Sequence, residues 1–230
     1  HPDPPNVYNV SYMQGVFPLI RMYDYCKQEN NIVFEKPGEQ FHLSKPAVCG
    51  SFCGSLSHGE VHSPISYISI VDQAIVTGGS SIVITRNGEL LSDEMVEFPT
   101  DAFGIKSHYI RFRDDNRVSL SYRKKLNTHI KEGILLSCDH DNNYFHWLIE
   151  CLPKLLLVDG LKQYRCVPLL IPNDLHENLQ VALKKVNIYH HPIINLEPGV
   201  AYKVKRLIFP SALSRVLDRY KGLPEIEDIV

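Results

Sequence analysis

The chain has 230 residues, of which 44% are hydrophobic and 22% are charged, and its formal net charge at pH 7 is −2. This composition is typical of a folded soluble protein. The nearly balanced charge excludes a general electrostatic attraction to nucleic acid. No apolar run approaches the roughly 18 residues that a membrane span needs, so we expect neither a nucleic-acid partner nor a membrane span.

Six cysteines stand at positions 26, 49, 53, 138, 151 and 166. Their spacing is not that of a disulfide scaffold in a small chain. Cys138, Cys151 and Cys166 lie in or beside apolar segments, where a thiol acts as a small buried hydrophobe. We therefore predict a reducing compartment and a cytoplasmic location. The chain begins without Met, so we also expect a fragment or a processed protein.

The first hundred residues are predicted to be mainly β. Residues 31–35 form a short extended segment, and residues 65–76 carry alternating and β-branched apolar positions. Two apolar runs then flank Asn87-Gly88, which readily takes the positive φ angles of a two-residue turn. This pattern predicts a β-hairpin over residues 81–91.

A loop rich in Gly, Ser and His carries Cys49, Cys53, His58 and His62. These residue types are zinc ligands. The interval between Cys53 and His58 is too short for a usual zinc finger, so a plain loop or an acceptor-contacting segment is the preferred interpretation.

Residues 77–81, TGGSS, form a separate Gly-rich stretch. It lacks the lysine and the following helix of a phosphate-binding loop, which favours a simple turn. The chain also lacks the Gly-x-Ser-x-Gly and Gly-x-Gly-x-x-Gly patterns.

The second half predicts strands that alternate with helices. Apolar runs at residues 133–137, 166–172, 192–196 and 204–209 are of strand length, and Asp174 with Glu177 resembles a helix-starting capping box. Alternation of this kind predicts a mostly parallel sheet with helices on both faces. The predicted class is α/β, with a β-rich segment over 1–125 and a Rossmann-like region over 126–230.

The stretch of residues 133–160 holds the strongest functional signal. A short apolar strand leads into a polar loop at 137–143, and a mostly apolar segment of helical length follows at 144–158. The polar residues at its start and along it are Asn143, His146, Glu150 and Lys154, at spacings of three, four and four. Such spacings place side chains along one line of a helix. Pro153 predicts a kink within it.

This polar line is predicted to lie where ligands bind. In open parallel sheets, ligands sit outside the carboxyl ends of the strands, and the start of a helix adds partial positive charge. A carboxylate at position 150 can orient the imidazole of His146 as a base near neutral pH, or Glu150 can itself be the base. The structural alternative is a buried His–Glu hydrogen bond without catalysis.

Asp139-His140-Asp141 offers a different interpretation, because carboxylates at a strand end can bind a metal. A second carboxylate motif of that kind does not occur later in the chain, so a metal site is not the preferred prediction.

Residues 143–155, NYFHWLIECLPKL, resemble the signature of glycosyltransferase family 61, approximately N-Y-x-H-W-L-[IL]-[DE]-x-L-P-[KR]-L. The flanks agree in outline over residues 60–212, with a Gly turn in the β-rich part and later runs VPLLIP and KRLIFPS. The resemblance implies half of a type-B architecture, in which two Rossmann-like domains face a cleft. The family's Arg-rich donor-binding part is not found here, so we expect the N-terminal, acceptor-side portion.

The resemblance implies an inverting, metal-independent transfer of a sugar from a nucleotide-sugar donor, UDP-linked, to a hydroxyl group of a glycan or protein. No cofactor is expected. The predicted catalytic residues are His146 and Glu150, and the predicted substrate-binding residues are Asp139, Asp141, Asn142, Asn143, Tyr144 and Lys154. Two other functions stay open: a glycan- or partner-binding module without catalysis, and a metallohydrolase that uses Asp139, His140 and His146.

Overall fold

The structure is a computed structural model, and it describes residues 12–42, 60–97, 110–113, 116–123, 128–138 and 140–213. The predicted zinc-ligand candidates Cys49, Cys53 and His58 lie outside the described residues, and so does Asp139.

The strands are β1 (Tyr12–Ile20), β2 (Ile32–Lys36), β3 (Gln40–His42), β4 (Glu60–His62), β5 (Ser66–Val76), β6 (Val83–Ile84), β7 (Leu90–Leu91), β8 (Ile110–Arg113), β9 (Arg117–Arg123), β10 (His129–Leu135), β11 (Leu169–Pro172), β12 (Ile193–Leu196) and β13 (Tyr202–Pro210). The helical segments are α1 (Met22–Gln28), α2 (Asp93–Glu97), α3 (Tyr144–His146), the π-helix η1 (Trp147–Cys151), α4 (Lys154–Asp159), the 3-10 helix η2 (Lys162–Tyr164) and α5 (Glu177–Val186).

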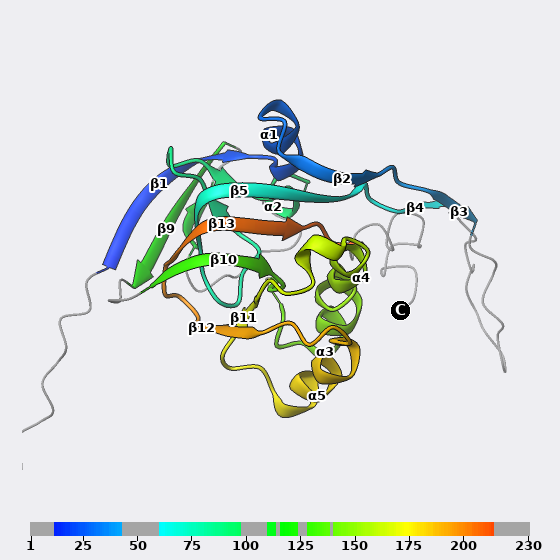
Figure 1. Cartoon of the computed structure of the whole chain (residues 1–230). Helices are drawn as coiled ribbons and strands as arrows, with labels where there is room; N and C mark the ends of the chain where they lie inside the picture. Colours follow the sequence, from blue (N-terminus) through cyan, green and yellow to red (C-terminus); the bar gives the residue numbers. More distant parts are fainter. Residues whose placement is uncertain are drawn as a thin grey trace, which may run out of the picture.

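One mixed sheet of eleven strands organises the described residues (Figure 1). Its order is β12-β11-β10-β13-β5-β6-β7-β1-β9-β8, and β2 pairs with β5. Strands β12, β11, β10 and β13 are mutually parallel, whereas β13 pairs antiparallel with β5 from Tyr202–Val76 to Pro210–Ile68. The predicted α/β class is therefore confirmed, but the sheet is mixed, because outside these four strands only β1 and β7 pair in parallel among the described strands.

The order of the four parallel strands defines a topological switch point. From β10 the chain moves outward to β11 and then to β12, and it returns with β13 on the other side of β10. This is the 3-2-1-4 part of the Rossmann strand order. The switch point therefore lies between the carboxyl ends of β10 and β13, where open α/β sheets bind ligands.

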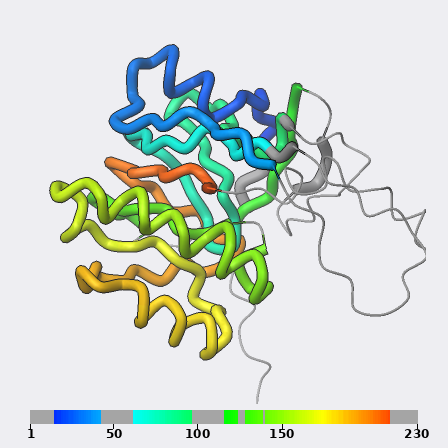
Figure 2. Tube along the Cα trace, turned by 90° about the vertical axis from the view of Figure 1, so that its right-hand side faces the viewer, coloured from blue at the N-terminus to red at the C-terminus, as the bar shows by residue number. Residues whose placement is uncertain are grey.

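Apolar side chains of the parallel strands are buried on both faces. Ile134 of β10 faces a core that includes residues of α4 and α5, while Leu135 faces a core that includes Met22 and Cys26 of α1. Figures 1 and 2 show α1 and α5 at opposite ends of the molecule. A strand buried on both faces needs a continuous apolar run, which accounts for the sequences GIL and LLI.

The β-rich first part joins the same sheet through the β5–β13 pairing. The sheet is thus continuous across the predicted boundary at residue 125, and the division into two domains stays a prediction. The hairpin is confirmed, because β6 pairs antiparallel with β7. The predicted two-residue turn is wrong, because Gly88 has a φ of 81° but Asn87 does not have a positive φ, and Thr85 and Glu89 close the turn.

The predicted start of α5 is wrong in detail. Asp174 is not the capping residue, because the N-cap is His176, whose Nδ1 accepts a hydrogen bond from the Asn178 N–H at 3.2 Å. The buried face of α5 contains Leu179 and Leu183, as its apolar periodicity predicts.

Gly78 offers a test of the fold. An added Cβ there would lie 2.3 Å from the Leu196 carbonyl oxygen, which is backbone and cannot rotate away. We expect Gly78→Ala to lower the free energy of unfolding by about 1–3 kcal/mol through overpacking. Gly160→Ala is the matched control, because its nearest contact would be 3.4 Å and its φ is −62°.

Denaturant unfolding of the two variants beside the unsubstituted chain makes the comparison. The control is expected to be neutral or more stable by about 0.5 kcal/mol, because alanine restricts the unfolded chain. Equal stability of both variants would show that β12 and the Gly78 turn do not approach each other as described.

Candidate active site

The candidate site lies at the carboxyl end of β10, beside the switch point. The chain leaves the strand at Leu135, passes the buried Leu136 and Ser137, and turns through residues 140–143 into α3. Figure 1 shows α4 beside the ends of β10 and β13, with α3 between α4 and α5. Every predicted site residue that the structure describes lies in this strand–loop–helix unit.

The predicted single helix over residues 144–158 is interrupted. A single turn of α-helix is followed by the π-helix η1, and α4 begins only after Pro153. Leu152 donates its backbone N–H to the Trp147 carbonyl at 2.9 Å, five residues back. Pro153 has no N–H to continue an α-helical ladder, which accounts for the break. π-helical turns are frequent at functional sites.

Trp147 anchors this irregular segment. Its ring is fully buried, and its indole Nε1 donates a hydrogen bond to the Leu179 carbonyl of α5 at 3.1 Å. A buried indole needs a partner for its N–H, and here the partner fixes the segment against the next helix.

His146 and Glu150 meet, as their spacing predicts. His146 Nδ1 lies 2.8 Å from Glu150 Oε2, and the two side chains are 19% and 11% exposed. Because Glu150 engages Nδ1, His146 Nε2 is the ring nitrogen left to face a ligand. The geometry is that of a carboxylate that orients an imidazole.

Lys154 is buried with a residue exposure of only 2%. Its ammonium donates a hydrogen bond to the Ser137 carbonyl at 2.9 Å and lies 5.9 Å from the centre of the Phe209 ring. Ser137 follows β10 and Phe209 lies near the end of β13, so Lys154 links the two strand ends across the switch point. Sequence reasoning placed Lys154 on the polar line but did not foresee this burial.

Asp141 is the most perturbed carboxyl group of the site. It is 3% exposed, and neither its Oδ2 nor the hydroxyl of Ser137 has a hydrogen-bond partner in the described part of the chain. Burial, followed by the charge of Asp174, raises its pKa from 3.8 to about 7. The Ser137 hydroxyl lies close enough to Asp141 to lower the pKa, without the geometry of a full hydrogen bond, and the Lys154 ammonium and the Cys138 backbone also lower it, all by smaller amounts.

The remaining predicted residues lie on the surface of the same loop. Asn143 caps α3, because its Oδ1 accepts from the Phe145 N–H at 2.9 Å. Asn142 donates through Nδ2 to Asp174 Oδ2 at 3.3 Å, and Tyr144 is 61% exposed. The Asn143 side chain thus occupies the Phe145 N–H at the start of α3. With three residues, α3 is also too short to supply the partial positive charge that the sequence predicted at this helix start.

The structure adds residues from distant parts of the sequence. A small cavity of about 20 Å³ is lined by Lys154 and by side chains from the first hundred residues and the end of β13, namely Ser81, Ser92, Asp93, Glu94, Phe209, Ser211 and Ala212. Asp93 accepts from the Tyr67 hydroxyl at 2.5 Å and from the Tyr23 N–H at 3.0 Å. Pairings between strands far apart in sequence bring these residues here, so no local pattern could have found them.

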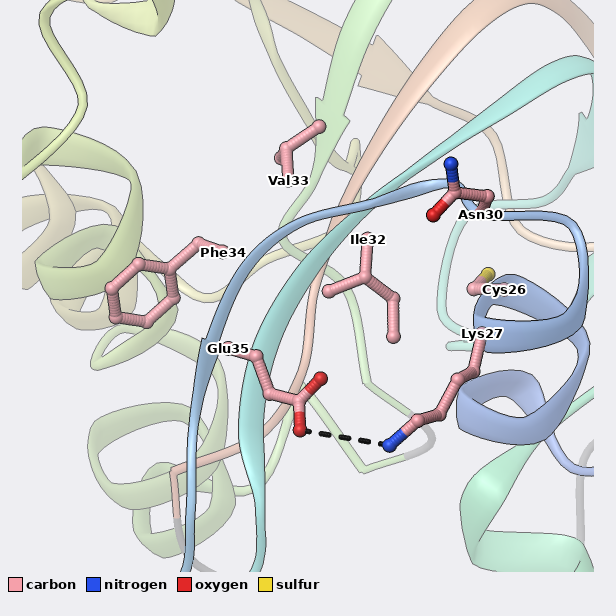
Figure 3. A pocket seen from close by; sticks show the side chains of 7 residues that line it. All are labelled: Cys26, Lys27, Asn30, Ile32, Val33, Phe34 and Glu35. Atoms are coloured by element: carbon pink, nitrogen blue, oxygen red, sulfur yellow. Dashed lines mark ion pairs between the residues drawn. The ribbon is translucent and has the colours of Figure 1, made fainter.

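A second, larger hollow of about 310 Å³ lies between α1 and β2 (Figure 3). Lys27 and Glu35 reach toward each other there, with Nζ and Oε1 3.9 Å apart. Burial raises the pKa of the Cys26 thiol to about 11, which keeps it from acting as a nucleophile near neutral pH. This hollow therefore holds no reactive group comparable to those beside β10.

The interpretation of Cys138, Cys151 and Cys166 as three small buried hydrophobes is wrong. Cys138 and Cys151 are buried but form a disulfide, with Cα atoms 6.0 Å apart, and Cys166 is exposed. The bond joins the end of β10 to η1, a proximity that only the folded chain creates. Disulfides persist mainly in oxidising compartments, which argues against the predicted reducing environment.

Among the described residues, no group of three or more His, Cys, Asp or Glu side chains is arranged to hold a metal ion. No described helix combines the length and apolar character that crossing a membrane would require. Comparisons with family models, curated proteins and solved structures return no match.

The raised pKa of Asp141 predicts a pH-dependent stability. The folded carboxyl group binds its proton more tightly than the unfolded one, so its contribution to the free energy of unfolding falls as pH rises from about 4 to about 7 and is constant above. We expect Asp141→Asn to become more stable than the unsubstituted chain over that range, by up to about 4 kcal/mol.

Denaturant unfolding at several pH values measures this difference. Asp72→Asn, at an exposed position of β5, is the control and should follow the unsubstituted chain at every pH. Parallel pH curves for Asp141→Asn and the unsubstituted chain would contradict the perturbed carboxyl group.

Alkylation of the native chain tests the disulfide. We expect a maleimide to modify the exposed Cys166 and to leave Cys138 and Cys151 unmodified until a reductant is added, as peptide mass spectrometry can show. Reduction should lower the free energy of unfolding by roughly 2–3 kcal/mol, as for a closed loop of this length. Alkylation of Cys138 without a reductant would contradict the bond.

Proposed function

We propose that the chain is the acceptor-side portion of an inverting glycosyltransferase. It would transfer a sugar from a UDP-linked donor to a hydroxyl group of a glycan or protein acceptor. The observation that carries the proposal is the His146–Glu150 pair, which lies at a Rossmann-type switch point within the segment that resembles the family 61 signature.

The strand order supports the proposed architecture. Type-B glycosyltransferases are built from two Rossmann-like domains, and the parallel strands here follow the 3-2-1-4 order of such a domain. We propose that this chain supplies one wall of the cleft and that a second domain supplies most contacts to the nucleotide. Fold likeness alone does not establish an activity, so the proposal depends on the residues of the site.

The proposed chemistry is a single displacement at the anomeric carbon of the donor. The acceptor hydroxyl oxygen forms a bond to that carbon while the bond to the diphosphate oxygen breaks, and the electron pair leaves with the nucleoside diphosphate. His146 Nε2 would take the hydroxyl proton, and Glu150 would hold the ring and stabilise the imidazolium. A metal ion is not needed for this displacement if positive charge of the second domain faces the diphosphate.

The surface around His146 is suited to a sugar-bearing acceptor. Tyr144 and Phe145 are 61% and 45% exposed, and the Phe145 and His146 rings meet edge to face with centroids 5.5 Å apart. Asn142 and Asn143 are exposed beside them and can donate and accept hydrogen bonds. Aromatic faces combined with a few polar groups are typical of small-ligand sites. The same surface could serve a binding module without catalysis.

The compartment follows from the disulfide. A cytoplasmic location stays a prediction, and the Cys138–Cys151 bond favours an oxidising compartment instead, because cytosolic reductants keep most thiols reduced. We propose that the acceptor is met in such a compartment.

Glu150→Gln in the full-length natural protein tests the proposed function. UDP-N-acetylglucosamine, UDP-xylose and UDP-arabinose are offered with a glycan array, and transfer is followed by mass spectrometry. We expect turnover to fall by about 10²-fold, because glutamine cannot stabilise the imidazolium. Glu29→Gln, at an exposed position after α1, is the control and should leave turnover unchanged.

Near-normal turnover in Glu150→Gln would remove this pair from the mechanism. Binding of array glycans by the unsubstituted protein, without transfer from any of the three donors, would support the non-catalytic module instead.

A further inference from the structure

We propose that Asp141 is a positioning residue for His146: its neutral carboxyl group holds residues 140–143 against the end of β10, and its ionisation releases them. These residues are called the acidic loop below. Protonation of Asp141 would control whether the loop is ordered whatever reaction the site performs. Only the consequence for sugar transfer rests on the proposed function.

Asp141 is the inward-facing residue of the acidic loop. It is 3% exposed, whereas His140, Asn142 and Asn143 are all exposed. Its Oδ2 is fully buried and has no hydrogen-bond partner in the described part of the chain. A buried carboxylate oxygen without a partner is strongly unfavourable, while a neutral carboxyl group carries a much smaller desolvation penalty.

The charges around Asp141 do not compensate its ionisation. Asp174, in the connection between β11 and α5, opposes it with a like charge. Lys154 of α4 favours the charged form, but its ammonium already donates to the Ser137 carbonyl. Ser137 and the Cys138 backbone, at the end of β10, also favour the charged form. Burial outweighs these contributions, so the loop is most stable in place when Asp141 is protonated.

The acidic loop is connected directly to His146. Asn143 donates its backbone N–H to the His140 carbonyl, and its own carbonyl accepts from the Trp147 N–H, both at 2.9 Å. The Asn143 side chain caps α3, and the His140 and His146 rings lie 5.0 Å apart. Displacement of the loop would therefore remove the first turn that carries His146.

The disulfide and the Trp147 hydrogen bond hold the flanks of the loop at residues 138, 147 and 151, but few described contacts hold residues 140–143 themselves against other elements. The described side-chain hydrogen bond from the loop to another element is Asn142 Nδ2 to Asp174 Oδ2, which is exposed and 3.3 Å long. Such a bond contributes little in water. The protonation state of Asp141 can therefore decide whether the loop stays closed.

Hydrogen–deuterium exchange of the full-length natural protein at pH 6 and pH 8.5 tests the proposal. Exchange times are scaled for the intrinsic rate, and a peptide that covers residues 140–147 is followed. In the unsubstituted protein we expect exchange of this peptide to become at least fivefold faster than the scaling predicts at pH 8.5. Asp141→Asn is permanently neutral and should keep the slow exchange seen at pH 6.

Two further variants make the test specific. Asp72→Asn is the control for loss of a carboxylate at an exposed position and should behave as the unsubstituted protein. Asp174→Asn removes a negative charge that opposes ionisation of Asp141. We therefore expect the midpoint pH of loop release to be lower in this variant than in the unsubstituted protein. A pH-independent exchange rate in the unsubstituted protein, or the same pH response in Asp141→Asn, would overturn the proposal.

Sugar transfer provides the second readout. The turnover of the unsubstituted protein should decline above about pH 7, and the turnover of Asp141→Asn should not. Replacement of a merely structural residue would leave the pH at which turnover declines unchanged. Absence of transfer at every pH would contradict the proposed function while the exchange result stands. Transfer with an unchanged alkaline decline in Asp141→Asn would contradict the positioning role alone.

Discussion

The site depends on one buried lysine. Lys154 is almost fully buried, in the wall of a cavity that Asp93 and Glu94 also line, and a buried charge without partners would be very unfavourable. Its hydrogen bond to the Ser137 carbonyl holds the end of β10, and its position near the Phe209 ring relates it to the end of β13. The four parallel strands therefore meet the helical segment at a polar contact, although their cores are apolar.

Much of the fold follows from local sequence. Short apolar runs bounded by Gly and Pro predict β11, β12 and β13, and Asn87-Gly88 predicts the hairpin, because strand burial and turn geometry act over a few residues. The pairing of β5 with β13 could not be predicted, since it joins residues far apart in sequence. That pairing joins the four parallel strands to the β-rich part of the sheet, and Asp93 lines a cavity with Lys154 and Phe209 beside the switch point.

The candidate site shows the same division. The spacing of His146 and Glu150 predicts their contact, because neighbours four residues apart meet on a helical surface. The burial of Asp141 and the Cys138–Cys151 bond are set by how the loop folds back on β10, which no periodicity encodes. The π-helix could not be predicted either, because the sequence indicates only that Pro153 interrupts an α-helix.

These unpredicted features form one energetic arrangement. Ser137 and Asp141 have buried polar atoms that make no hydrogen bond with any described residue, which destabilises the end of β10. The disulfide from Cys138 and the hydrogen bond of Trp147 to α5 act on the same segment and offset that loss. Local rules fail most often where a protein accepts strain for function. The buried Asp141 carboxyl group, the π-helix and the disulfide all lie in the segment that carries His146 and Glu150, which is the arrangement expected if the function proposed for that pair is correct.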